Sequence, residues 1–153
     1  MAEPLALEVV LEDPAWLEAL PDAPSLATHA LQIAANAERA SGEVCVLLTS
    51  SEAMRALNAR WRGADYPTNV LSFPAAEAAG AGLGDIALGL GVLREEAQAQ
   101  GKSLRDHFLH LLVHGLLHLL GYDHETDGQA QIMEGRERAI LAGLAVPDPY
   151  LER

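Results

Sequence analysis

The sequence predicts an α+β fold, in which a small mixed sheet of about four strands is flanked by about five helices. Short β-branched runs such as EVCVLLT (43–49) alternate along the chain with longer segments of helical periodicity. The strand-like runs are few and irregular, and neither GxGxxG nor GxxxxGK[ST] occurs, which argues against a doubly wound nucleotide-binding fold. Segment 104–120 is apolar nearly all round, which predicts a central, buried helix.

Local patterns of alternation, periodicity and capping define the elements. Strands are predicted at 7–12, 43–49, 69–73 and 85–90. Helices are predicted at 24–40, 51–60, 92–100, 104–120 and 127–142, and a loop at the Ala- and Gly-rich residues 75–84. The helix starts rest on side chains that can accept hydrogen bonds from free backbone N–H groups: Ser50 or Ser51, Ser103, and Thr126 or Asp127.

Length and composition indicate a single folded domain, 1–153. The chain contains no internal repeat or linker, and half of its 153 residues are hydrophobic, which argues against disorder. Cys45 is the only cysteine, so no internal disulfide can form, and a cytoplasmic location is expected. The N-terminal segment lacks the basic start of a signal peptide, and no apolar run is long enough to span a membrane.

The charge balance restricts how the chain could bind nucleic acid. It has 22 acidic against 10 basic residues, and the net charge of −12 opposes long-range attraction to phosphate backbones. A nucleic-acid substrate would therefore need a local basic site. Most basic residues are expected to be solvated charges on helix faces, but two sparse groups could supply such a site: Arg55, Arg60 and Arg62, and Arg94, Lys102 and Arg105.

The segment HGLLHLLGYDH (114–124) is the main chemical signal of the chain. His114 and His118 are one helical turn apart, so both imidazoles can reach one metal ion. Gly121 can adopt a positive φ and end the helix, which lets the chain turn back and offer His124 as a third ligand. Three protein ligands with an open fourth position are typical of a catalytic zinc, although nickel or copper would also fit three imidazoles.

The same spacing occurs in the metzincin proteases, HExxHxxGxxH, so the predicted site is zincin-like. Gly115 stands where those enzymes carry the glutamate that acts as general base. Peptide hydrolysis by the usual route is therefore not expected. Metzincins also have a methionine beneath the zinc, and Met133 could correspond to it, but a methionine in a helix core is the simpler interpretation.

Other polar side chains could support the ligands or line their pocket. His107 and His110 continue the stripe of the two helical ligands, and a buried imidazole is costly unless it is satisfied. We interpret both as residues behind the ligands or in the pocket wall, and His29 as a residue without a special role. Asp85 and Asp123 are the candidate carboxylates, either as general base or as partners that orient a histidine ring, although simpler structural roles are open to both.

Three motifs, in this order and spacing, closely resemble the bacterial YbeY family of metal-dependent endoribonucleases: LNARWRGADYPTNVLSFP (57–74), GDIALGL (84–90) and HGLLHLLGYDH (114–124). The resemblance covers nearly the whole chain, and the segment DPYLER (148–153) is also similar to that family's C-terminus. It implies an α+β fold with a mixed sheet, a cytoplasmic location, and one zinc ion per chain bound by His114, His118 and His124.

The resemblance also implies an activity and partners. The implied activity is cleavage of single-stranded RNA, in maturation of the 3′ end of small-subunit ribosomal RNA and in ribosome quality control. The implied partners are ribosomal RNA and the ribosome or its proteins, and neither a membrane nor DNA is expected. Arg62 takes the place of the family's functional arginine, and its planar guanidinium suits a phosphate. The family often has Asp where Asn69 stands, and Asn69 cannot serve as a carboxylate base.

Zinc held by three neutral imidazoles would lower the pKa of bound water from about 15.7 towards about 7. The zinc-bound water is the expected catalytic group, either attacking phosphorus or helping to activate the RNA 2′-OH, and both routes stay open. Two other functions are also open. One is a zinc hydrolase of another class, against which Gly115 argues. The other is a non-catalytic ribosome- or RNA-binding factor with a structural zinc.

Overall fold

The computed structural model describes residues 5–75 and 82–151, and it confirms the predicted α+β fold with a mixed sheet. The sheet has the order β1-β2-β4-β3, with parallel β1, β2 and β4 and with β3 antiparallel to β4 at one edge. Its strands are β1 (Ala6–Leu11), β2 (Glu43–Thr49), β3 (Val70–Pro74) and β4 (Gly82–Gly89). Within the described ranges there are six helices: α1 (Ala15–Ala19), α2 (Ala23–Glu38), α3 (Ser51–Arg62), α4 (Leu90–Gln100), α5 (Leu104–Leu119) and α6 (Asp127–Gly143).

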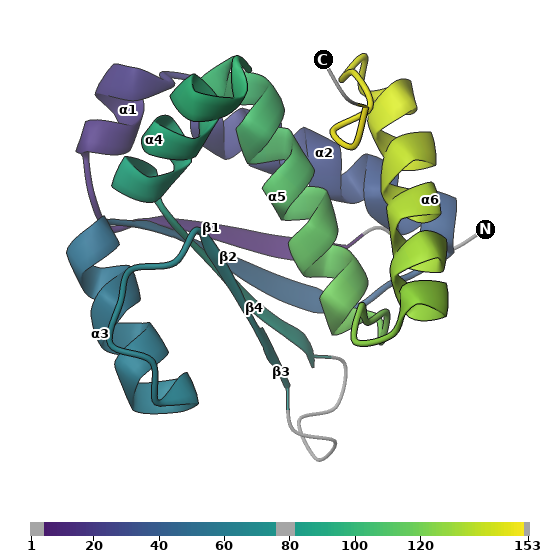
Figure 1. The fold of residues 1–153 in the computed structure, drawn as a ribbon, viewed down its shortest axis with the longest axis horizontal. Coiled ribbons are helices and arrows are strands. Elements are labelled where there is room, and N and C mark those ends of the chain that lie inside the picture. The colour runs from purple at the N-terminus through teal and green to yellow at the C-terminus, as the bar shows by residue number, and fades with distance from the viewer. Residues whose placement is uncertain (1–4, 76–81, 152–153) are drawn as a thin grey trace.

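The helices divide unequally between the two faces of the sheet (Figure 1). Helix α5 packs against β3 and β4 on one face and also contacts α2, α4 and α6. Helix α3 lies on the other face, against β4. The main core therefore forms around α5, and several of its large side chains are inaccessible to solvent: Trp16, Leu48, Ile86, Phe108 and Leu112.

The capping predictions are confirmed at the ends that position the site. Ser103 Oγ accepts from the backbone N–H of Asp106 at 3.0 Å at the start of α5. Thr126 and Gln129 form a capping box at the start of α6. The apolar surface of helix α5 is covered by other elements of the fold. None of the helices described here is both long and apolar enough to cross a membrane.

The structure contains one helix that is not predicted, and one strand begins several residues before its predicted start. Helix α1 is not predicted, because its five residues are too few to show helical periodicity. Strand β4 begins at Gly82, before the predicted start, because Gly82 and Gly84 pair with β2 despite the low strand propensity of glycine. Of the predicted loop at 75–84, residues 76–81 lie outside the described residues.

Candidate metal centre

Helix α5 and the turn after it bring His114, His118 and His124 together. Gly121 adopts a φ of +100°, as its predicted role requires, and the chain turns back after it. The ligand atoms of the three histidines all lie within 4.8 Å of one another, so they could hold one metal ion. Two ligands thus come from the helix and the third from the short segment that joins α5 to α6.

The imidazoles fit a transition-metal ion. Burial, and next the neighbouring His114 and His124, lower the pKa of His118, so its ring is neutral near pH 7, the state that binds metal. The backbone of Tyr122 is hydrogen-bonded to the same ring. His114 Nδ1 lies 3.3 Å from Glu137 Oε2 and donates to it, which leaves Nε2 for a metal ion. This donor set suits zinc, nickel or copper.

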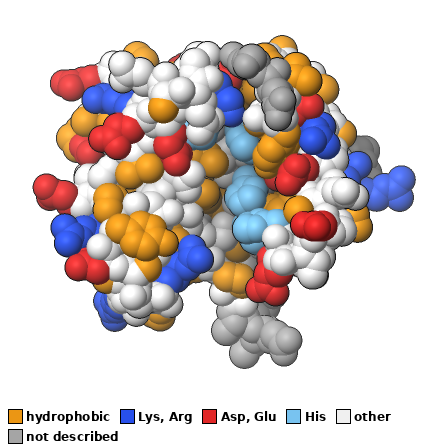
Figure 2. Space-filling view, viewed as in Figure 1, with side chains coloured by type: hydrophobic (Ala, Val, Ile, Leu, Met, Phe, Trp, Pro, Cys, Tyr) orange, Lys and Arg blue, Asp and Glu red, His pale blue; other side chains and the backbone are white. Residues whose placement is uncertain are grey.

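The histidines open onto a cavity of about 710 Å³. Its opposite wall comes from β3 and the end of α3, including Trp61, Arg62 and Phe73. Figure 2 shows the histidine side chains along the edge of a hollow in this face. Residues from two distant parts of the sequence therefore share one solvent-accessible site.

Arg62 ends α3 and its side chain is exposed in this cavity. It forms no hydrogen bond or ion pair with any described residue, whereas Arg55 on the same helix is paired with Asp65 at 2.8 Å. Trp61 is 61% exposed, and its ring contacts the guanidinium of Arg60 and the edge of Phe73. An unpaired arginine beside an exposed aromatic ring is available to an incoming phosphate and base.

Glu137, on α6, is the site residue that sequence reasoning missed. It is 0% exposed and accepts hydrogen bonds from His110 Nε2 (2.6 Å), Tyr150 OH (2.7 Å) and His114 Nδ1 (3.3 Å). Burial raises the pKa of its carboxyl, but these hydrogen bonds outweigh burial and bring the pKa to about 2. A signal was present in the sequence, because helical spacing places Glu137 on the same face as the buried Met133 and Ile140.

His107 does not reach the metal ligands. Its Nε2 lies 2.8 Å from Glu96 Oε1, and Glu96 also accepts from Asn69, which lines the metal cavity. Burial lowers the pKa of His107. The buried Nδ1 atoms of His107 and His110 have no hydrogen-bond partner among the described residues, whereas Nε2 of each ring faces a carboxylate, to which it can donate.

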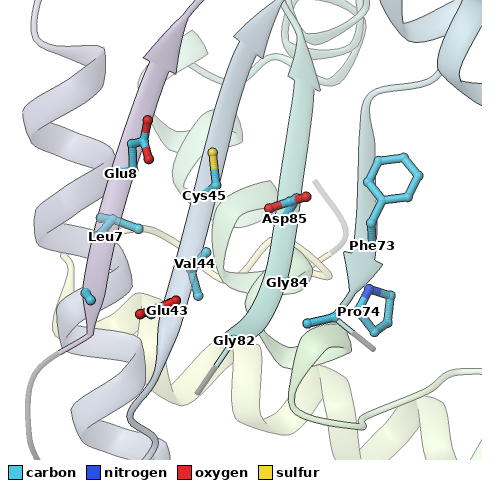
Figure 3. A pocket seen from close by; sticks show the side chains of 12 residues that line it. Leu7, Glu8, Glu43, Val44, Cys45, Phe73, Pro74, Gly82, Gly84 and Asp85 are labelled. Atoms are coloured by element: carbon cyan, nitrogen blue, oxygen red, sulfur yellow. The ribbon is translucent and has the colours of Figure 1, made fainter. Parts of the chain in front are cut away.

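The two candidate carboxylates lie in different places. Asp123 lines the metal cavity, where its Oδ1 accepts from the backbone N–H of His124 at 2.8 Å. Asp85 is exposed beside Cys45 of the neighbouring strand and lines cavities that none of the three histidines borders (Figure 3). The structure therefore does not bring Asp85 to the histidines, because the adjacent Ile86 is the side chain that faces α5.

Gly115 marks a close approach of α5 to the sheet. A Cβ at this position would lie 3.0 Å from Ile86 Cγ2 and 3.2 Å from Ser72 Oγ. Ser72 Oγ also donates to the Gly115 carbonyl at 3.0 Å. A glutamate at 115 would thus disturb the packing of the ligand helix. For this reason, the absence of peptidase activity in a Gly115→Glu variant would not show whether the wild-type site lacks only a general base.

Known proteins resemble this chain along most of its length. The family described as Endoribonuclease YbeY matches residues 18–145. The protein named Endoribonuclease YbeY of Rhodopseudomonas palustris (strain BisB5) is 46% identical over 162 residues, with 97% of this chain and 83% of that protein covered. The protein of the same name from Bradyrhizobium sp. (strain BTAi1) is 45% identical over 157 residues, with 95% and 92% covered.

A solved structure supports the fold. The solution structure of TM1509 from Thermotoga maritima matches with a TM-score of 0.53 and 23% sequence identity. The match covers 95% of this chain and 96% of that one. At this level of identity the likeness shows a shared fold and nothing finer.

Proposed function

The chain belongs to the YbeY family of endoribonucleases, as its motifs predicted, and on that premise we propose that it is a zinc-dependent hydrolase of single-stranded RNA. One observation carries the proposal: three histidines that could share a metal ion face an unpaired arginine across one open cavity. Residues 1–153 form one such catalytic domain. Its physiological roles are 3′-end maturation of small-subunit ribosomal RNA and ribosome quality control, in the cytoplasm and with the ribosome or its proteins as partners.

We assign one Zn²⁺ per chain to His114, His118 and His124. The lowered pKa of His118 and the free Nε2 of His114 support this assignment, and the same donors would also accept nickel or copper. When bound, zinc would supply a water molecule acidic enough to act at neutral pH. A carboxylate base for the reaction would come from Asp123 or Glu125, which line the cavity, and not from Asp85.

Arg62 binds the phosphate that undergoes cleavage. Its guanidinium can donate to two phosphate oxygens at once, and no carboxylate in the described structure competes for it. Because the net charge of −12 repels RNA at long range, this local contact must supply much of the attraction. Arg62 therefore both positions the substrate and stabilises the charge that develops on phosphorus.

Trp61 accounts for the preference for single strands. Its exposed ring lies at the rim of the same cavity as the histidines. Stacking of a base on an aromatic side chain contributes about 1–3 kcal/mol per base. A base within a duplex is already stacked on both sides, so only an unpaired nucleotide can use this ring.

The test is cleavage of a labelled single-stranded RNA by protein of measured metal content. Wild type should carry one zinc and cleave the RNA, and His114→Ala should lose both properties. Arg62→Glu should keep its zinc and lose about 10²- to 10³-fold in kcat/KM, the scale expected when a donor to the transition state is removed. The control Arg55→Glu, on the same helix but paired with Asp65, should behave as wild type.

A second candidate function is a non-catalytic RNA- or ribosome-binding factor with a structural metal. Because the net charge of −12 makes unaided RNA binding weak, such a factor would engage the ribosome through protein partners. Stoichiometric zinc without cleavage, or equal cleavage by all four proteins from a contaminating nuclease, would support that function. Unfolding upon chelation would support it too, because structural metal binding contributes directly to folding. We expect chelated protein to stay folded, since α5 is already held by the main core.

A further inference from the structure

The carboxylate of Glu137 is fully buried, and within the described residues it is hydrogen-bonded to three side chains that can donate to it. Oε1 accepts from His110 Nε2 and from the Tyr150 hydroxyl, while Oε2 faces His114 Nδ1. A buried carboxylate is costly unless it is hydrogen-bonded, so this arrangement has to be satisfied as a unit. Only one of its three partners, His114, belongs to the candidate metal ligands.

Glu137 determines which nitrogen of His114 carries the proton. A carboxylate only accepts, so the Nδ1 that faces it must bear the hydrogen. The lone pair is then on Nε2, the nitrogen left for the metal. His118 has its ring hydrogen-bonded to the backbone of Tyr122 instead, and the ring of His124 contacts those of His114 and His118 but forms no hydrogen bond with a described side chain. Glu137 is therefore the acidic side chain that orients a ligand from behind.

The segment after α6 holds this carboxylate in place. Asp148 accepts from Arg138 Nε at 3.0 Å and from the backbone N–H of Tyr150 at 2.8 Å, and the guanidinium of Arg138 lies over the Tyr150 ring. These contacts fix the Tyr150 hydroxyl 2.7 Å from Glu137 Oε1. Residues 148–150 thus connect through Glu137 to a candidate ligand on α5.

We propose that Glu137 is a positioning residue that presents Nε2 of His114 to the metal, and that Tyr150 makes the C-terminal segment part of the metal centre by fixing Glu137. The inference rests on the metal site of the proposed function, but not on RNA cleavage. It concerns protein residues alone, so it can be read from the tautomer of His114 in metal-free protein as well as from metal affinity.

Glu137→Gln is the decisive change, because the surroundings dictate how the new amide must lie. Two donors, His110 Nε2–H and the Tyr150 hydroxyl, face the Oε1 position, so the amide oxygen will occupy it. The amide NH₂ is then directed at His114 Nδ1, which must become an acceptor and move its proton to Nε2. The shape of the side chain is kept, but the nitrogen intended for the metal is blocked.

The experiment measures Zn²⁺ affinity by competition with a chromophoric chelator, and the tautomer of His114 by ¹⁵N NMR in the metal-free full chain. We expect the Nδ1–H tautomer in wild type, the Nε2–H tautomer in Glu137→Gln, and zinc binding weakened by about 10- to 100-fold in the variant. Glu134→Gln is the matched control. Glu134 lies one turn earlier on α6. Glu134 and Glu137 both line a cavity of about 370 Å³ that His114 and His124 also border, but Glu134 forms its ion pair with Arg138.

Tyr150→Phe tests the contribution of the C-terminal segment. It removes one hydroxyl from a partly exposed ring, so folding is preserved, and we expect zinc affinity to fall by about twofold to tenfold. Unchanged affinity in this variant would overturn the role of the segment. Wild-type affinity and tautomer in folded Glu137→Gln would overturn the role of Glu137.

The result remains decisive if Glu137→Gln does not fold, since a His114 that carries its proton on Nε2 in wild type would also overturn the proposal. If wild type binds no zinc at all, the proposed function fails first. Zinc binding that is equal in wild type and Glu137→Gln defeats only this inference.

Discussion

The two halves of the histidine stripe on α5 differ in what covers them. His107 and His110, in the first half, lie under neighbouring helices, and their rings contact Glu96 of α4 at 2.8 Å and Glu137 of α6 at 2.6 Å. His114 and His118, in the second half, reach the open cavity beside His124. Residue type and helical spacing are the same in both halves. The carboxylates of Glu96 and Glu137 meet Nε2 of His107 and His110, which makes these rings structural. In His114 the carboxylate of Glu137 meets Nδ1 instead, so Nε2 stays available to a metal.

The largest expected effect comes from removing a ligand in the open half. His118→Ala should lower zinc affinity by more than the about 100-fold typical of losing a supporting partner, and cleavage should fall to background. The metal-free variant should remain folded, because the core around α5 is unchanged. Zinc content after desalting and the thermal midpoint of metal-free protein check both statements. The exposed His29→Ala is the control, and full zinc retention by His118→Ala would contradict the division of the stripe.

A smaller effect is expected in the covered half. His107→Ala removes a buried imidazole together with its contact to the half-buried carboxylate of Glu96, and should lower the free energy of unfolding by about 1–3 kcal/mol while one zinc per chain remains bound. His107→Gln, which can still donate to Glu96, should lose less. Urea unfolding of metal-free protein and zinc analysis measure the two quantities. A variant with normal stability but without zinc would place His107 in the metal-binding half.

The smallest effect is a pH dependence of stability. Burial lowers the pKa of His107, Glu96 opposes the shift, and His110 and Lys102 add to it. Because the unfolded chain then binds more protons than the folded one, the stabilisation is complete above the unfolded pKa of about 6.5 and is lost as the pH falls towards the folded value. Between about pH 7 and about pH 5 the unfolding free energy of metal-free wild type should fall more steeply than that of His107→Gln. Parallel slopes in the two proteins would show that His107 is not the group responsible.

Much of the fold was predictable because its signals are local. Strand alternation and the caps Ser50, Ser103 and Thr126 each depend on a few consecutive residues, and the structure contains all three caps. The strand order β1-β2-β4-β3 was not predictable in this way, since it depends on which distant segments pair. Helix α1 was missed for the opposite reason, because it is too short to produce a periodic pattern.

In the candidate site, too, the residues that could be predicted are those that local sequence patterns bring together. The three histidines lie within eleven residues, so helical spacing and one glycine were enough to bring them together. Glu137 is 23 positions from His114, and Tyr150 a further 13, and no local pattern links them. The functional role expected for Arg62 came from a family resemblance rather than from spacing, and its place opposite the histidines comes from the structure. The distance of Asp85 from the histidines could not be predicted, because the side of the sheet that Asp85 faces is known only once β4 is placed against α5.

The Glu137 network also has a consequence for the order in which the chain is made. All three histidines leave the ribosome before α6 and residues 148–150, which supply the carboxylate and the hydroxyl behind His114. A nascent chain can therefore form α5 and expose its histidines while His114 still lacks the group that fixes its proton. Under the proposed function, selective loading of the metal would then belong to a late stage of biogenesis, after α6 has docked on α5, rather than to the folding of the ligand helix itself.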